Sequence, residues 1–279
     1  MKVRALQFAP RLGDLQANLE EHVRLIGRAR EAECDLAVFP ELSLTGYQLK
    51  DIVFDVCLRP GDETFARLMR LSREIDILVG APVEEPAGII HNCALYFSNG
   101  ELAHCHRKVQ LPNFGMFEER MLYQAGTEFR TFKVGSLTVG LLICREILFP
   151  PNAWLYHLQF ADLVIAISNS PFRGMGPDGF TSFSLWETMG YVSSVFFHLN
   201  YLFVNRTGFE DGIGFGGGSF FAPAGKGIQV RAPYLDPAEM DLEIDPTAVR
   251  RARLSGNYRR DERLDVIRRE LERIQNAGT

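Results

Sequence analysis

No apolar run in the 279 residues approaches the ~18 residues that a membrane-spanning helix requires. The first residues, Met1 to Gln7, resemble a strand rather than the apolar core of a secretory signal. An excess of basic residues is also missing, because 30 Lys and Arg stand against 35 Asp and Glu and leave a formal net charge of −5. A nucleic-acid-binding surface needs a basic stripe. We therefore expect no membrane contact, no nucleic-acid partner and a cytoplasmic location.

Cysteine is scarce and shows no paired spacing. The five cysteines are odd in number and none forms a C-x-x-C motif, which favours free thiols in a reducing cytoplasm over a disulfide framework or a zinc knuckle. His104 and His106 alternate onto one face of a predicted strand, but no third ligand stands at a spacing that would support a metal site. We expect neither a metal nor another cofactor.

Internal repeats, low-complexity segments and linkers are absent as well, so we predict one main domain. Short apolar runs typical of buried strands alternate with segments of helical periodicity. The predicted strands include 3–8, 36–39, 77–80, 127–134, 137–143, 163–167 and 240–244, and the predicted helices include 15–26, 61–75, 151–160 and 182–199. Early strand–helix units followed by paired strands predict an α/β fold with mixed sheets and helices packed outside.

Two glycine-containing motifs predict hairpins. Asn99-Gly100 lies between two strand-like runs, which is a strong hairpin pattern. Residues 212–217 form a literal G-x-G-x-x-G, but a dinucleotide site needs a helix after it, and residues 219–223 are strand-like. We therefore favour a hairpin there over a nucleotide site.

The tail at 261–275 repeats apolar residues at helical spacing, in Leu264, Ile267, Leu271 and Ile274, with charges elsewhere. Such a narrow seam predicts a helix that packs on the body of its own subunit or, as we favour, on a neighbouring subunit.

One stretch, 140–146, combines a short apolar run with a cysteine and a charged pair. The run predicts a buried strand that ends at Cys144, and the carboxyl ends of strands are where α/β proteins place their chemistry. Taken by itself, this stretch favours Cys144 as a small buried core residue, which is the usual position of a cysteine.

Glu41 and Lys108 stand in the same context as Cys144, each at or near the end of a strand-like run. Together the three types form a coherent chemical set. A nearby ammonium favours a thiolate nucleophile, and a carboxylate can accept the thiol proton and return it to a leaving amine. The ammonium and a backbone N–H after the cysteine can stabilise the oxyanion of a tetrahedral intermediate.

Three blocks that contain these residues, 39–47, 107–112 and 140–144, resemble the signature blocks of the nitrilase, or carbon–nitrogen hydrolase, superfamily. The resemblance extends from about residue 3 to about residue 245. Within the superfamily, residues 111–120, 168–172 and 216–219 are most similar to the glutamine amidotransferase domain of glutamine-dependent NAD synthetase.

The resemblance implies a four-layer αββα sandwich with two mixed β-sheets, helices on the outside and subunits that associate in homodimers or larger homo-oligomers. We place the hydrolase domain at 1–258 and a C-terminal helical tail at 259–279. By resemblance Cys144 is the nucleophile, Glu41 the general base, and Lys108 the stabiliser of the oxyanion. Glu119 matches a second glutamate that orients the lysine, with neighbouring Glu118 as the alternative.

Tyr47, Phe114, Phe117 and Ser170 match positions that line the substrate pocket in the family, although aromatic core residues and a turn serine would look the same. Arg145 departs from the amidotransferase relatives, which have an acidic residue there. A guanidinium suits a carboxylate or an electron-rich carbonyl, which argues against free glutamine as substrate. Arg145 could instead pair with Glu146.

The leading hypothesis is a metal-free thiol amidase that cleaves a non-peptide C–N bond of a small linear amide through a thioester at Cys144, releasing ammonia or an amine. The alternatives are a nitrilase or an N-carbamoyl amidohydrolase on the same fold, or a glutaminase-type subunit that supplies ammonia to a separate NAD synthetase. Nothing after Cys144 resembles an ATP-pyrophosphatase loop, so a synthetase would have to be a separate chain. A catalytically inactive scaffold is disfavoured, because all three reactive residues are present.

Overall fold

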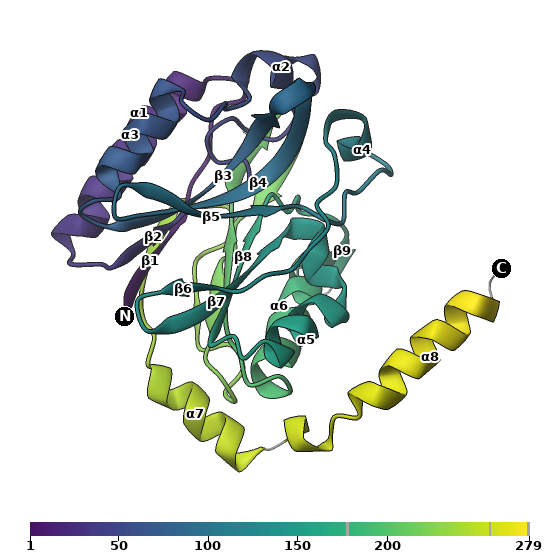
Figure 1. Ribbon diagram of the computed structural model, residues 1–279. Helices are drawn as coiled ribbons and strands as arrows, with labels where there is room; N and C mark the ends of the chain where they lie inside the picture. Colours follow the sequence, from purple (N-terminus) through teal and green to yellow (C-terminus); the bar gives the residue numbers. More distant parts are fainter. Residues whose placement is uncertain (177–178, 257, 278–279) are drawn as a thin grey trace.

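The computed structural model describes residues 1–176, 179–256 and 258–277, and in it two six-stranded sheets face each other with helices on both outer faces (Figure 1). The predicted αββα sandwich is thereby confirmed. Between the sheets, apolar residues of both inner faces, such as Val38 and Leu78 from one and Leu141 and Ile165 from the other, form one continuous core.

The first sheet has the strand order β16-β1-β2-β3-β4-β5. Its strands are β1 (Lys2–Gln7), β2 (Leu36–Val38), β3 (Asp76–Glu85), β4 (Ile89–Ser98), β5 (Glu101–Arg107) and β16 (Ala238–Glu243). Helices α1 (Leu15–Glu31) and α3 (Glu63–Leu71) cover its outer face and bury apolar side chains such as Leu19, Ile26 and Leu68 against the strands. Asp14 caps α1, since its side chain accepts a hydrogen bond from the Ala17 N–H.

The second sheet has the strand order β15-β14-β11-β8-β7-β6. Its strands are β6 (Phe132–Val134), β7 (Leu137–Ile143), β8 (Leu163–Ser168), β11 (Asn200–Asn205), β14 (Phe220–Ala222) and β15 (Val230–Arg231). Helices α5 (Pro150–Leu158) and α6 (Thr181–Val195) lie on its outer face (Figure 1). The predicted strand at 127–134 is too long, because only its last three residues pair with β7.

The remaining elements lie between these strands and helices or follow the last strand. They are η1 (Lys50–Ile52), α2 (Val53–Val56), η2 (Pro86–Gly88), α4 (Glu119–Leu122), η3 (Cys144–Leu148), β9 (Met175–Gly176), β10 (Gly179–Phe180), β12 (Thr207–Glu210), β13 (Ile213–Gly216), α7 (Pro246–Ser255), η4 (Tyr258–Asp261) and α8 (Leu264–Ala277).

Both glycine motifs form hairpins, as predicted. Asn99 and Gly100 have φ values of 53° and 84° and join β4 to β5, which is the backbone that a tight two-residue turn requires. The G-x-G-x-x-G segment forms most of the β12–β13 hairpin and is followed by β14. A strand in place of a helix rules out the dinucleotide arrangement there.

The predicted C-terminal helix is present as α8, which projects away from the two sheets (Figure 1). No residue of α8 is buried, and Leu264, Leu271 and Ile274 are exposed. Among the described helices, none combines the length and apolar character needed to cross a bilayer.

Candidate active site

Parallel strands bring the three candidate residues to one edge of the molecule. In the first sheet β2 runs parallel to β1 and β3, and in the second sheet β7, β8 and β11 are parallel. Glu41 follows β2, Lys108 follows β5, and Cys144 follows β7, so each lies just beyond the carboxyl end of a strand. Such edges are where open α/β sheets form their sites.

Three donors hold the carboxylate of Glu41, which has no exposed surface. Its Oε1 accepts hydrogen bonds from Lys108 Nζ at 2.6 Å and from Asn92 Nδ2 at 2.8 Å. Its Oε2 accepts from the backbone N–H of Asn169 at 2.8 Å, and Asn169 follows strand β8 of the other sheet. A buried carboxylate is stable when it is paired and hydrogen-bonded in this way.

Lys108 is fully buried between two carboxylates. Its Nζ donates to Glu41 Oε1 at 2.6 Å and to Glu119 Oε1 at 2.8 Å. Burial alone would lower the pKa of Lys108, but the negative charges of Glu119 and Glu41 outweigh burial and raise the pKa above its ordinary value. The ammonium therefore remains charged at neutral pH.

The structure brings Glu119, not Glu118, to the lysine. Glu119 is buried at the start of α4, whereas Glu118 is exposed. Burial raises the pKa of Glu119 to about 7, a rise that Lys108 opposes and Glu41 reinforces. The second carboxylate therefore titrates near neutrality, and its charge is held by the lysine.

Cys144 lies at a sharp bend between β7 and η3, with a φ of 45° that non-glycine residues seldom adopt. The bend presents the thiol at the sheet edge and leaves 6% of the residue exposed. Burial, reinforced by the Glu41 charge, raises the pKa of the thiol to about 12, although the Lys108 ammonium opposes the rise. The resting group at neutral pH is therefore the thiol, and attack requires a base.

Arg145 is the second residue of η3, so the helix itself does not use its backbone N–H. This is the backbone N–H after the cysteine that we expect to stabilise an oxyanion.

The predicted pocket aromatics form a connected row beside these groups. The Tyr47 hydroxyl donates to Glu119 Oε1 at 2.7 Å, and the Tyr47 ring meets Phe117 edge-on at 6.1 Å between centroids. Phe117 in turn contacts Phe114 at 5.2 Å, and the guanidinium carbon of Arg145 lies 5.0 Å from the centroid of Phe114.

Ser170 lies on the β8 side of the site and is buried. Its N–H donates to Asn205 Oδ1 at 2.8 Å, which fixes the turn. Its hydroxyl and the side-chain amide of Asn169 are buried and have no hydrogen-bond partner within the described residues, whereas the Ser168 hydroxyl interacts with the Cys144 thiol. Buried polar groups of this kind are normally satisfied, so these atoms are available to a bound molecule.

Sequence reasoning missed three residues that hold the site together: Asn92, Asn169 and Glu146. Glu146 accepts hydrogen bonds from the N–H groups of Val109 and Ile143, at 2.6 Å and 2.7 Å, and so ties the residue after Lys108 to the residue before Cys144. The alternative pairing of Arg145 with Glu146 is therefore wrong, because the carboxylate is occupied elsewhere. Two of these residues could have been found from the sequence: Asn169 lies in the turn 168–172, and Glu146 stands two residues after Cys144. No comparable feature indicates Asn92.

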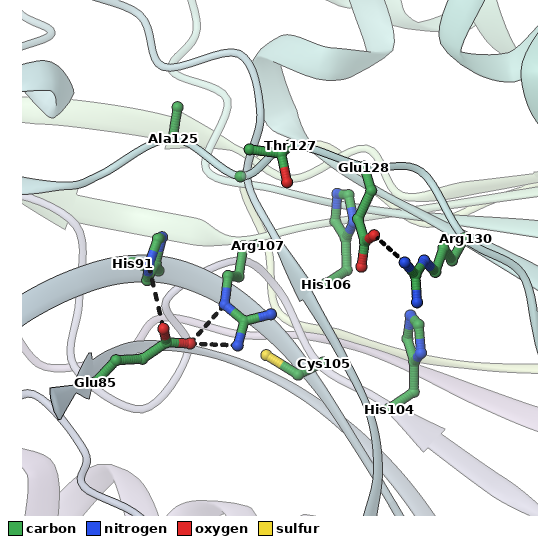
Figure 2. Close-up of a pocket in the computed structure, with 11 residues that line it drawn as sticks. Glu85, His91, His104, Cys105, His106, Arg107, Ala125, Thr127, Glu128 and Arg130 are labelled. Atoms are coloured by element: carbon green, nitrogen blue, oxygen red, sulfur yellow. Dashed lines mark hydrogen bonds and ion pairs between the residues drawn. The ribbon is translucent and has the colours of Figure 1, made fainter.

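Figure 2 shows a pocket lined by residues of β3, β4, β5 and the segment 125–130. Its volume is about 230 Å³. His104 and His106 both line it, but its charged groups are paired with one another: Glu85 contacts Arg107, and Glu128 contacts Arg130. His106 Nε2 lies 2.8 Å from Glu146 Oε2. Over the described ranges, no cluster of three or more His, Cys, Asp or Glu side chains has the arrangement of a metal site.

Together these groups are of the types that acyl transfer requires. The charges of Glu41 and Lys108 act on the Cys144 thiol. In general, a carboxylate can take the proton of a thiol, and an ammonium and a backbone N–H can stabilise an oxyanion.

Comparison with known proteins agrees with this chemistry. The carbon-nitrogen hydrolase family matches residues 2–236. The glutamine-dependent NAD(+) synthetase of Thermotoga maritima is 29% identical over 227 residues, which cover 80% of this chain and 38% of the synthetase. The chain thus spans about two fifths of the length of that relative.

Solved structures show the same similarity. The glutamine-dependent NAD+ synthetase of Acinetobacter baumannii, in complex with ADP, superposes with a TM-score of 0.77 at 26% identity. The superposition covers 87% of this chain and 45% of the synthetase chain. A carbon-nitrogen hydrolase from Helicobacter pylori superposes with a TM-score of 0.85 at 22% identity and covers 95% and 96% of the two chains, a likeness that shows the shared fold.

Proposed function

This chain belongs to the carbon–nitrogen hydrolase family, and we propose that it is a thiol amidase that hydrolyses the C–N bond of a small linear amide through a thioester at Cys144. The observation that carries the proposal is the position of Lys108 Nζ, 2.6 Å from Glu41 and 2.8 Å from Glu119, beside a nucleophile from the other sheet.

In the first step Glu41 accepts the proton of the Cys144 thiol while the sulfur attacks the amide carbon. A base is needed because burial holds the pKa of the thiol at about 12. The negative charge that develops on the carbonyl oxygen is stabilised by the Lys108 ammonium and the Arg145 backbone N–H. Lys108 can perform this task at neutral pH because Glu119 and Glu41 keep its pKa raised against the effect of burial.

The tetrahedral intermediate then breaks its C–N bond. Glu41 returns the proton to the leaving nitrogen, so ammonia or an amine departs and the acyl group remains on sulfur as a thioester. A water molecule next attacks the thioester carbon while Glu41 accepts one of its protons. Collapse breaks the C–S bond, releases the carboxylic acid and restores the thiol, so the net reaction consumes one amide and one water.

Ammonia release from a panel of small amides tests the proposal. Wild-type protein should release ammonia and, after rapid quenching, show the mass of one acyl group added to the chain. Cys144→Ala should do neither, whereas Cys105→Ala, which changes a cysteine on β5 outside the site, should behave as wild type. Turnover by Cys144→Ala would refute the mechanism.

A second candidate is favoured by the NAD synthetase relatives: a glutaminase-type subunit that supplies ammonia to a separate synthetase. The same panel distinguishes it. Hydrolysis of glutamine that appears only when a synthetase partner is added would favour this candidate, and strong hydrolysis of other amides by the protein alone would favour the amidase.

A further inference from the structure

A cavity of about 560 Å³ is lined by residues of the segment 109–114, by Arg120 and residues 123–125, and by Arg145 and Phe149. Two of its lining residues connect it to the candidate active site. Arg145 directly follows Cys144, and Phe114 contacts Phe117, which contacts the Tyr47 ring. A molecule bound in this cavity therefore lies beside the residue that follows the nucleophile.

Two guanidinium groups line the cavity, and neither has a carboxylate partner in the part of the chain that the structure describes. Arg145 contacts only aromatic faces, with its guanidinium carbon 5.0 Å from the Phe114 centroid and 5.6 Å from the Phe149 centroid. Arg120 donates from Nε to the backbone carbonyl of Leu111 at 3.3 Å. A ring contact uses the face of a guanidinium and leaves its N–H edge available for hydrogen bonds.

Many other arginines of the chain are paired with carboxylates. Arg107 is paired with Glu85, for example, and Arg231 is paired with Glu187. A third arginine at the site, Arg173, also contacts an aromatic ring, with its guanidinium carbon 4.9 Å from the Phe117 centroid. Arg145 and Arg173 therefore place positive charge beside Phe114 and Phe117, in a protein whose formal net charge is −5.

We infer that this cavity binds a carboxylate at the far end of the substrate, and that the preferred substrates are linear amides of dicarboxylic acids that carry no ammonium group. This inference rests on the proposed amidase function. The free N–H edge of Arg145 can form the bidentate contact that guanidinium makes with carboxylate. An ammonium in the same place would meet like charge, which selects against amino-acid amides such as glutamine.

Matched pairs of amides measure the preference. Succinamate, glutaramate and adipamate differ from butyramide, valeramide and hexanamide only by a carboxylate in place of a methyl group. In the pair whose carbon chain is long enough to reach Arg145, we expect kcat/KM to be about 10- to 100-fold higher for the acid than for the neutral amide. The free energy of one charge-assisted hydrogen bond corresponds to a ratio of this size. Glutamine should be a poorer substrate than glutaramate.

Arg145→Gln should remove most of this ratio, because the amide side chain keeps a donor but loses the charge. Arg70→Gln is the matched control, since Arg70 pairs with Glu63 on α3 and lies outside the cavity, and the ratio should not change. Equal kcat/KM values within every pair, or an unchanged ratio in Arg145→Gln, would overturn the inference.

Binding separates this inference from the proposed function. If the wild type hydrolyses no amide, the amidase proposal fails, and calorimetry with Cys144→Ala then tests the cavity directly. Tighter binding of glutaramate or one of its homologues than of the matched neutral amide, lost in Cys144→Ala/Arg145→Gln, would support the carboxylate site. Equal or undetectable binding of acid and neutral amides would refute it.

Discussion

Single residues at this site differ in protonation because their surroundings differ, although all are buried. Lys108 has two carboxylates within hydrogen-bond distance and a raised pKa, so it is charged. Cys144 has the Lys108 ammonium and the carboxylates of Glu41 and Glu119 near it, and burial has the largest effect, so its pKa of about 12 keeps the thiol neutral. The sequence-based picture of a thiolate favoured by the lysine is therefore incomplete, and the carboxylate is needed to generate the nucleophile.

Glu119 provides the sharpest test at this scale. Glu119→Gln removes one charge-assisted hydrogen bond from Lys108, and such a bond is worth enough to lower kcat by about 10- to 100-fold. Glu118→Gln is the matched control, because Glu118 is the exposed neighbour and should leave kcat unchanged. Steady-state kinetics on both variants checks this, and equal effects would contradict the assignment of Glu119 to Lys108.

The same substitution has a pH signature with a defined sign. Burial raises the pKa of Glu119 from its ordinary value of 4.5 to about 7, so the folded protein binds the proton more tightly than the unfolded chain. The contribution of Glu119 to the free energy of unfolding is therefore fully present below about pH 4.5 and is lost as the pH rises to about 7. Urea unfolding should show that wild type loses stability relative to Glu119→Gln over this window; a constant difference would refute the shift.

At the scale of elements, strand ends were predictable and the contacts between them were not. Short apolar runs that stop at a polar residue identified the positions of Glu41, Lys108 and Cys144. The partners that fix them come from strands far away in sequence, such as Asn92 in β4, which lies inside an ordinary strand pattern. Only the pairing of β4 with β3 and β5 sets Asn92 against Glu41.

The approach of β3 to the turn after β2 is one such contact, and Gly80 permits it. A Cβ at Gly80 would lie 2.3 Å from the Leu42 nitrogen and 2.6 Å from the Pro40 carbonyl oxygen, so the turn that carries Glu41 would have to move. Gly80→Ala should cost roughly 1–3 kcal/mol of unfolding free energy. It should also lower kcat sharply, since a displaced base loses its alignment with the thiol.

Gly27→Ala in α1 is the control for that change, because a Cβ there meets nothing within 4 Å. It should leave kcat unchanged and add up to about 1 kcal/mol of stability, since alanine is a better helix former than glycine. Denaturant unfolding and steady-state kinetics on both variants check the pair. Normal activity in Gly80→Ala would show that the close approach does not position Glu41.

At the scale of the whole molecule, the order of the layers could be predicted from the sequence. The surface that packs against the exposed C-terminal helix could not. Alternating strands and helices predicted mixed sheets with helices outside, and the family resemblance implied that the sheets are two; this is the arrangement in Figure 1. The apolar seam of α8 predicted that this helix packs on another surface. A pattern of apolar residues does not identify which surface that is. In the structure α8 buries no residue against its own subunit.

We propose that a second copy of the chain covers this seam. Leu264, Leu271 and Ile274 are 48%, 56% and 58% exposed, which is costly in water unless another surface buries them.

Light scattering after size exclusion would test this association. Wild-type protein should elute as a dimer or larger assembly, and the double substitution Leu271→Arg/Ile274→Arg should shift it towards smaller species, because two buried cations cannot be paired in an apolar seam. Arg269→Glu lies on the opposite side of α8, at 100° per residue, and should leave the assembly unchanged. A helix of this length relies on packing for its stability, which is why we expect a partner surface. An unaltered molecular mass in the double variant would mean that α8 does not form the contact between subunits.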